Sequence, residues 1–139
     1  MNKLTMRLGH SPDADDAFMF YAIAKNKVTS DRIDFVHVVE DIQSLNKRAL
    51  NGELEVTAIS AHGYLKVQDK YRIMSCGASM GEGYGPIVVS GEPVESLEGK
   101  RIGVPGMLTS AYLQLCIYAE GFIPVEMPFD EIMPAVQNG

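Results

Sequence analysis

Apolar residues along the first part of the chain follow the order strand, polar loop, helix, and this order repeats. Apolar and polar residues alternate over residues 4–8, and residues 18–24 form an apolar, alanine-rich run that is too long for a turn. An alternation of period two is typical of a strand, whereas long apolar runs with alanine favour a helix. Residues 32–39 then carry apolar side chains at odd and even positions, which predicts a strand buried on both faces. The pattern indicates an α/β fold.

Capping residues place the predicted helix ends. Asp13 is positioned to cap the first helix while the carboxylate of Asp16 reaches back, and Asp41 is positioned to cap the second, which Gly52 ends. Asp130 is expected to cap a last helical segment over residues 131–136.

The remaining strands and the domain division follow from shorter runs. We expect strands at residues 4–8, 32–39, 55–59, 71–76, 86–90, 101–104 and 122–127. A glycine-rich run, residues 77–85, lacks the sequence of a phosphate loop and indicates close backbone approach or hinge motion instead. We therefore predict a first lobe over residues 1–90, ending in a crossing strand, and the start of a second lobe over residues 91–139.

Polar side chains gather in the loops that follow three of the predicted strands, where α/β folds bind ligands. His10, Ser11 and Asp16 follow the first strand, Ser60 follows the third, and Thr109 and Ser110 open the helix of the second lobe. Each of these also has a structural interpretation. Ser60 serves equally as an N-cap, and one or two of the three aspartates at positions 13, 15 and 16 can be helix-start residues only. His62 can point to solvent, and a lone His37 within a strand is assigned no role.

Composition and charge narrow the class of partner. The chain has 139 residues, 46% hydrophobic and 22% charged, with a net charge of -6. Its isoelectric point near 5.0 argues against a nucleic acid or an anionic membrane as partner and favours a small molecule. Cys76 and Cys116 stand in unrelated contexts without clustered histidines, so neither a metal site nor a disulfide is expected. Without a signal-peptide pattern, we expect a cytoplasmic protein.

Several blocks of the sequence, in register, resemble one known family. These are His10-Ser11-Pro12 with the acidic turn, Glu40 to Asn46, Gly83 to Val89, Leu97 to Gly106 and Tyr118 to Glu126. Together they are similar to the menaquinone-biosynthesis family of the futalosine pathway, which has a type II periplasmic-binding-protein fold. Within that family the chain is most similar to the branch of the 1,4-dihydroxy-6-naphthoate synthases, over about residue 4 to the last residue.

The resemblance implies two lobes with mixed sheets and a ligand cleft between them. It implies conversion of cyclic dehypoxanthine futalosine to 1,4-dihydroxy-6-naphthoate by base-assisted cleavage, a lyase-type reaction without metal or other cofactor. It places Ser60 on one side of a carboxylate substrate and Thr109 and Ser110 on the other. In the acidic turn only Asp16 matches the synthases directly, and Asp15 replaces an amide by a charge, which leaves the exact substrate open.

Members of the family are about twice as long, and the histidine thought to be their general base lies beyond position 139. We therefore expect an incomplete second lobe, no catalytic residue that can be named within this chain, and marginal stability or self-association, homodimers included. Two other functions stay open: a cytoplasmic protein that binds a solute without catalysis, and the chorismate dehydratase step of the same pathway.

Overall fold

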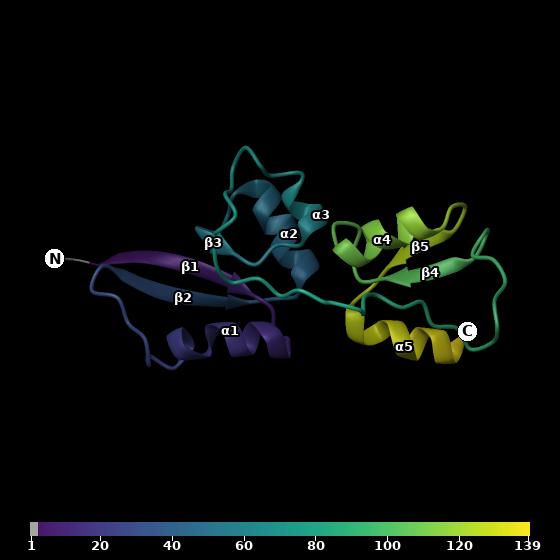
Figure 1. Cartoon of the computed structure of the whole chain (residues 1–139), viewed down its shortest axis with the longest axis horizontal. Helices are drawn as coiled ribbons and strands as arrows, with labels where there is room; N and C mark the ends of the chain where they lie inside the picture. Colours follow the sequence, from purple (N-terminus) through teal and green to yellow (C-terminus); the bar gives the residue numbers. More distant parts are fainter. Residues whose placement is uncertain (1–2) are drawn as a thin grey trace. The chain divides into compact units, whose positions relative to one another are not determined.

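The computed structural model describes residues 3–139, which divide into two compact units of the α/β class (Figure 1). The first unit ends at Met80, and the second runs from Gly81 to Gly139. The boundary falls inside the glycine-rich run predicted to allow hinge motion. The division into lobes at residues 90 and 91 stays a prediction.

The first unit is built on a parallel three-stranded sheet. Its elements in chain order are β1 (Leu4–His10), α1 (Ala14–Ala24), β2 (Ile33–Val39), α2 (Ile42–Asn51), β3 (Val56–Thr57) and α3 (Ala61–Tyr64). The strand order is β2-β1-β3, with Leu4 opposite Ile33 and Leu8 opposite Val56. Because β1 and β3 are parallel, the loops that follow them leave the same edge of the sheet.

Helices α1 and α2 cover opposite faces of this sheet (Figure 1). On one face, Phe20 of α1 stacks on His10 of β1. On the other face, α2 packs over Gly9, the residue of β1 that precedes His10. A Cβ atom on Gly9 would lie 2.8 Å from Leu45 Cδ2, so only glycine lets α2 approach this closely. Leu45 and Ala49 of α2 are fully buried and form the centre of this core.

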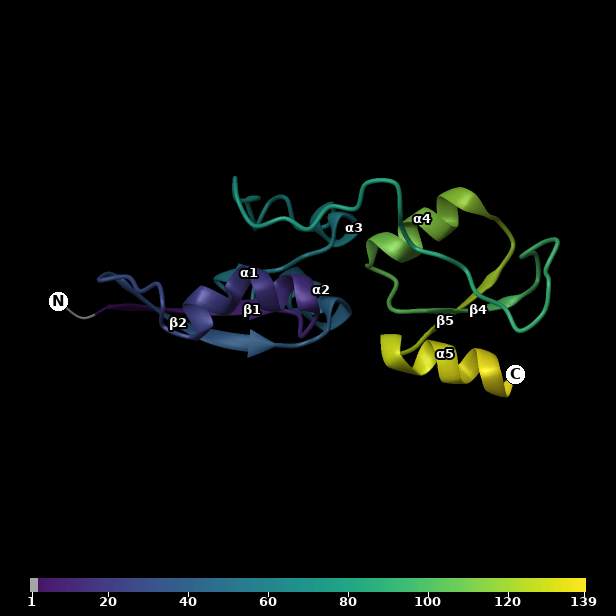
Figure 2. The same ribbon diagram turned by 60° about the horizontal axis from the view of Figure 1, so that its bottom comes forward.

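The second unit holds a parallel pair of strands between two helices. Its elements are β4 (Arg101–Val104), α4 (Ser110–Tyr118), β5 (Ile123–Glu126) and α5 (Phe129–Asn138). Arg101 lies opposite Ile123 and Val104 opposite Glu126. Figures 1 and 2 both show α4 and α5 on opposite sides of the two strands. The expectation that the strands at residues 4–8 and 101–104 belong to different sheets is confirmed.

Two predicted strands do not form, and the sheets are not mixed. Residues 71–76 and 86–90 have no strand pairing, and Ile87 is 82% exposed. A strand requires a neighbouring backbone, and no described residue supplies one to these segments. The strands that do pair among residues 3–139 are all parallel. The crossing strand expected at the end of the first lobe is therefore wrong for this structure.

The predicted burial of the second strand on both faces is also wrong. Val36 is 49% exposed and Val39 53% exposed. These side chains are exposed because β2 lies at the edge of the sheet and not in its centre.

The helix caps are partly as predicted. Asp41 accepts a hydrogen bond from Ser44 N–H at 3.0 Å, and Gly52 ends α2 with φ of 67°, so both predictions are confirmed. Asp13 is the N-cap residue of α1 but makes no side-chain cap, because Asp16 N–H donates to Asp15 Oδ1 instead. Asp130 lies inside the first turn of α5, which begins after Pro128, so that capping prediction is wrong.

Candidate functional site

The loop after β1 is organised around Ser11. The backbone N–H of Ser11 donates to Asp16 Oδ2 at 2.6 Å, and Asp13 N–H donates to Ser11 Oγ at 3.2 Å. His10 Nδ1 donates to the carbonyl oxygen of Ser11 at 3.1 Å. Ser11 and Asp16 are 5% and 7% exposed. The sequence-predicted residues His10, Ser11 and Asp16 are thus brought together, and Asp16 acts by holding the loop.

His10 has a second partner that sequence reasoning missed. Its Nε2 atom lies 2.9 Å from Nδ1 of His37 on β2. Burial lowers the pKa of His37 from its usual 6.5, and the proximity of His10 lowers it further. The signal was the strand register: His37 lies opposite Leu8, two residues before His10 and on the same face. That register was not established from the sequence.

Asp15 serves the structure of the loop region. Its carboxylate accepts from Asp16 N–H at 3.0 Å. A hydrogen bond with the Ser79 side chain lowers the pKa of Asp15, the residue at which the chain departs from the synthase pattern. Asp15 therefore connects the start of α1 to the glycine-rich run.

Ser60 caps α3 and is anchored by a buried amide. Gly63 N–H donates to Ser60 Oγ at 3.0 Å, which confirms the N-cap interpretation. Asn46 of α2, 1% exposed, donates to Ser60 Oγ at 3.1 Å and accepts from Ser60 N–H at 3.1 Å. Asn46 was not predicted as a site residue, because an asparagine on a helix does not indicate in the sequence that it will bond Ser60. It fixes the Ser60 backbone and side chain together.

Thr109 and Ser110 open α4, as predicted. Thr109 Oγ1 accepts from Tyr112 N–H at 3.2 Å and donates to the carbonyl of Gly106 at 2.8 Å, and the residue is 3% exposed. Its hydroxyl is therefore mainly structural. The hydroxyl of Ser110 has no hydrogen-bond partner among residues 3–139. Its amide precedes the first intrahelical bond, so this helix start can accept an anion.

The candidate residues lie in two separate units. His10, Ser11, Asp16 and Ser60 share one edge of the first sheet, and the Thr109–Ser110 pair belongs to the second unit. Each group thus lies at the carboxyl end of parallel strands, where α/β folds bind ligands. Convergence of the two groups on one ligand stays a prediction.

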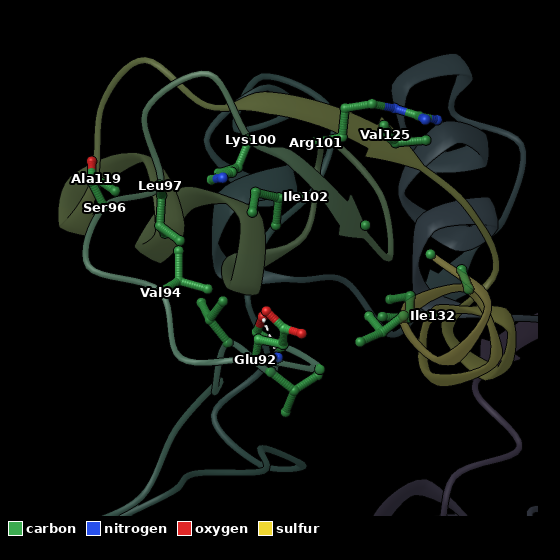
Figure 3. A pocket seen from close by; sticks show the side chains of 18 of the residues that line it. Glu92, Val94, Ser96, Leu97, Lys100, Arg101, Ile102, Ala119, Val125 and Ile132 are labelled. Atoms are coloured by element: carbon green, nitrogen blue, oxygen red, sulfur yellow. Dashed lines mark hydrogen bonds between the residues drawn. The ribbon is translucent and has the colours of Figure 1, made fainter.

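A groove in the second unit is not one of the predicted sites. Figure 3 shows Val94, Leu97, Ile102 and Ile132 among its lining residues, and it encloses about 1370 Å³. Pockets for small ligands hold roughly 300–1,000 Å³. The groove is therefore an uncovered face beside β4 and α5, and charged side chains such as Glu92, Lys100 and Arg101 line it together with the apolar ones.

Across residues 3–139, no three His, Cys, Asp or Glu side chains are grouped as a metal ion needs. Within the same range no helix has both the length and the apolar character to cross a bilayer.

The sequence matches a family described as menaquinone biosynthesis, over residues 6–139. The chain belongs to this family. The matched residues include every candidate loop, from His10 to Ser110.

Two curated relatives carry the name 1,4-dihydroxy-6-naphthoate synthase. The one from Thermus thermophilus is 43% identical over 134 residues, which are 96% of this chain and 49% of the relative. The one from Streptomyces coelicolor is 34% identical over 146 residues, covering 100% of this chain and 51% of the relative. The chain spans about half the length of these relatives.

A solved structure has the same fold as this chain over nearly the whole length of this chain. It is the crystal structure of a protein from Archaeoglobus fulgidus determined by a structural genomics consortium, with 56% sequence identity and a TM-score of 0.91. The match covers 96% of this chain and 50% of that protein.

Proposed function

We propose that the gene product containing this chain is a 1,4-dihydroxy-6-naphthoate synthase of the futalosine pathway. It converts cyclic dehypoxanthine futalosine to 1,4-dihydroxy-6-naphthoate by base-assisted cleavage, a lyase-type step. The observation that carries the proposal is the 43% identity, over 96% of this chain, to a relative with that name. The family match over residues 6–139 supports the same pathway.

The geometry of both units is suited to a carboxylate substrate. The start of α4 offers the amide and hydroxyl of Ser110, and backbone N–H groups at a helix start favour negative charge. In the first unit the hydroxyl hydrogen of Ser11 has no acceptor among residues 3–139, which leaves it for a ligand. We assign Ser110 to the carboxylate and the loops at Ser11 and Ser60 to the remainder of the substrate.

The fold that goes with this function is the type II periplasmic-binding-protein fold. In this proposal residues 1–90 form most of one lobe and residues 91–139 begin the other, with the substrate between them. The uncovered groove beside β4 and α5 is then closed by further strands, which is consistent with the chain's covering about half of its relatives. We assign no residue of this chain as the general base.

The proposal includes a cytoplasmic location and a reaction without a cofactor. Proton abstraction from a bound carboxylate substrate needs a base. Neither this step nor the bond cleavage that follows requires a metal or redox group. Homodimers remain part of the proposal as one way of covering exposed apolar surface.

The direct test is turnover by the purified gene product. Cyclic dehypoxanthine futalosine is supplied and 1,4-dihydroxy-6-naphthoate is measured by liquid chromatography with mass spectrometry. Chorismate is supplied in a parallel reaction. We expect the naphthoate product from the first substrate and no dehydration of the second. Dehydration of chorismate, or tight binding of the cyclic substrate without product, would contradict the proposal and favour one of the two other functions.

A further inference from the structure

The hydrogen-bonded pair His10–His37 is used by no step of the proposed reaction. His10 is 8% exposed and lies between three groups: the Ser11 carbonyl at 3.1 Å, His37 Nδ1 at 2.9 Å and the Phe20 ring, with 4.9 Å between ring centroids. Both nitrogens of His10 are therefore engaged, and its ring is clamped by stacking. Such a residue is placed to hold its neighbours rather than to bind a ligand directly.

The two hydrogen bonds determine where the protons of the neutral pair lie. A carbonyl oxygen only accepts, so the bond to Ser11 requires a proton on His10 Nδ1. The Nε2 atom of the neutral ring is then an acceptor, and the proton between the rings belongs to His37 Nδ1. A protonated His37 Nδ1 thus matches and supports the one tautomer of His10 that can donate to the Ser11 carbonyl.

The bond to the carbonyl completes the fixation of Ser11. Its N–H is held by Asp16 and its Oγ accepts from Asp13 N–H, so three bonds define the position of this residue. The hydroxyl hydrogen is the group that remains for a ligand. If His10 changed tautomer, its Nδ1 lone pair would face the carbonyl oxygen, and the loop would have to move.

We propose that His37 is a positioning residue: through His10 it holds the Ser11 loop in the conformation that presents the Ser11 hydroxyl to the substrate. The substrate-binding part of this inference rests on the proposed function. The proton arrangement of the two rings does not, and it can be tested separately.

The first measurement is the ¹⁵N NMR spectrum of the histidine rings in the protein at neutral pH. His10 and His37 are assigned by their absence in single variants. We expect protonated Nδ1 and unprotonated Nε2 in both rings, whereas most exposed neutral histidines carry the proton on Nε2. A protonated Nε2 on His10 in the wild-type protein would overturn the inference, whatever the enzyme assay shows.

The second measurement is a kinetic comparison of two variants at position 37. Asn places an N–H donor near the position of the imidazole Nδ1, and Leu fills similar space without a donor. We expect His37→Leu to raise KM about tenfold with kcat changed less than about twofold, because Ser11 contributes to binding and not to bond cleavage. We expect His37→Asn to remain within about threefold of wild type.

Val36→Asn and Val36→Leu are matched controls on the same strand. Val36 lies opposite Arg7, on the other face from His37, and is 49% exposed, so these two report the effect of each residue type on β2 without the histidine pair. We expect both to keep the wild-type KM. Equal KM values for His37→Leu and wild type would overturn the inference, and so would a loss in His37→Leu that His37→Asn does not restore. If the wild-type protein makes no product, the proposed function fails, and the ring spectrum alone decides whether His37 holds His10.

Discussion

At the scale of single residues, the loop after β1 uses its carboxylates for structure. Asp16 receives the backbone N–H of Ser11 at 2.6 Å, and Asp15 receives Asp16 N–H at 3.0 Å and bonds Ser79. Like charges this close together in the sequence repel one another. Because these negative charges are directed at backbone and hydroxyl donors of the loop, part of their charge is compensated locally.

Removal of the Asp16 carboxylate should destabilise the protein. In Asp16→Ala a buried N–H loses a charged acceptor, and we expect a loss of about 1.5–3 kcal/mol in the free energy of unfolding. Asp13→Ala is the matched control, since Asp13 makes no side-chain cap, and we expect a change within about 0.5 kcal/mol. Urea denaturation measures both. Equal losses in the two variants would contradict the assignment of the stabilising bond to Asp16.

The ion pair of Arg7 with Glu55 should make stability depend on pH in the acid range. Hydrogen bonds from the Arg7 side chain lower the pKa of Glu55 from 4.5 to about 2. Between these values the unfolded chain binds a proton that the folded chain does not, so stability falls as pH falls from 4.5 toward 2.

This is measured as the urea concentration at the midpoint of unfolding, at several pH values between 5 and 2. We expect Glu55→Gln to flatten the fall in this range, while the exposed Glu95→Gln keeps the wild-type slope. An unchanged slope in Glu55→Gln would mean that the pair does not persist in solution, as is common for exposed pairs.

At the scale of elements, what could be predicted from the sequence is what depends on local chemistry. The positions of β1, β2, α2 and α4 follow from periodicity and from caps such as Asp41 and Thr109, whose acceptors bond N–H groups three residues on. The predictions at residues 71–76 and 86–90 failed because a strand depends on a partner, which local pattern does not reveal. The same applies to the site: Ser60 was found from its place after a strand, whereas Asn46 and His37 act across distances in sequence that no motif spans.

The contact between α2 and α3 should tolerate no side chain at Gly63. A Cβ atom there would lie 2.6 Å from Asn46 Oδ1, inside any allowed contact. We expect Gly63→Ala to destabilise the protein by about 1–3 kcal/mol, because the Asn46–Ser60 bonds must break or shift.

A double-mutant cycle with Asn46→Ala isolates this clash. The second substitution removes the obstructing amide, so we expect the double variant to be more stable than the sum of the two single losses predicts. Strict additivity in thermal or urea unfolding would show that Gly63 is required for another reason. Gly91→Ala serves as control, since nothing lies within 4 Å of its Cβ position.

At the scale of the whole molecule, large apolar side chains remain on the surface of each unit. In the first unit Phe18 is 87% exposed, and in the second Ile117 and Tyr118 are 78% and 80% exposed. Soluble monomers rarely leave such groups uncovered in patches. The isolated 139-residue chain should therefore associate with itself or unfold at low denaturant concentration.

Sedimentation velocity over a range of concentrations tests this expectation. We expect the weight-average sedimentation coefficient of the 139-residue chain to rise with concentration. A single monomeric species at all concentrations, with cooperative two-state unfolding, would contradict it. The variant Ile117→Lys probes one patch, and reduced association in this variant would assign the contact to α4.

The central claim is that loops from both units serve one substrate in a synthase reaction. The most direct measurement is kcat/KM of the gene product for cyclic dehypoxanthine futalosine in Ser11→Ala, Ser110→Ala and the double variant. Ser90→Ala is the control, because Ser90 lies in segment 86–90, which forms no strand. The account predicts product formation by the wild-type protein, a loss of about five- to twentyfold in kcat/KM for each site variant, and no loss for the control. Absence of 1,4-dihydroxy-6-naphthoate from the wild-type reaction, or wild-type kinetics in both site variants, would contradict it.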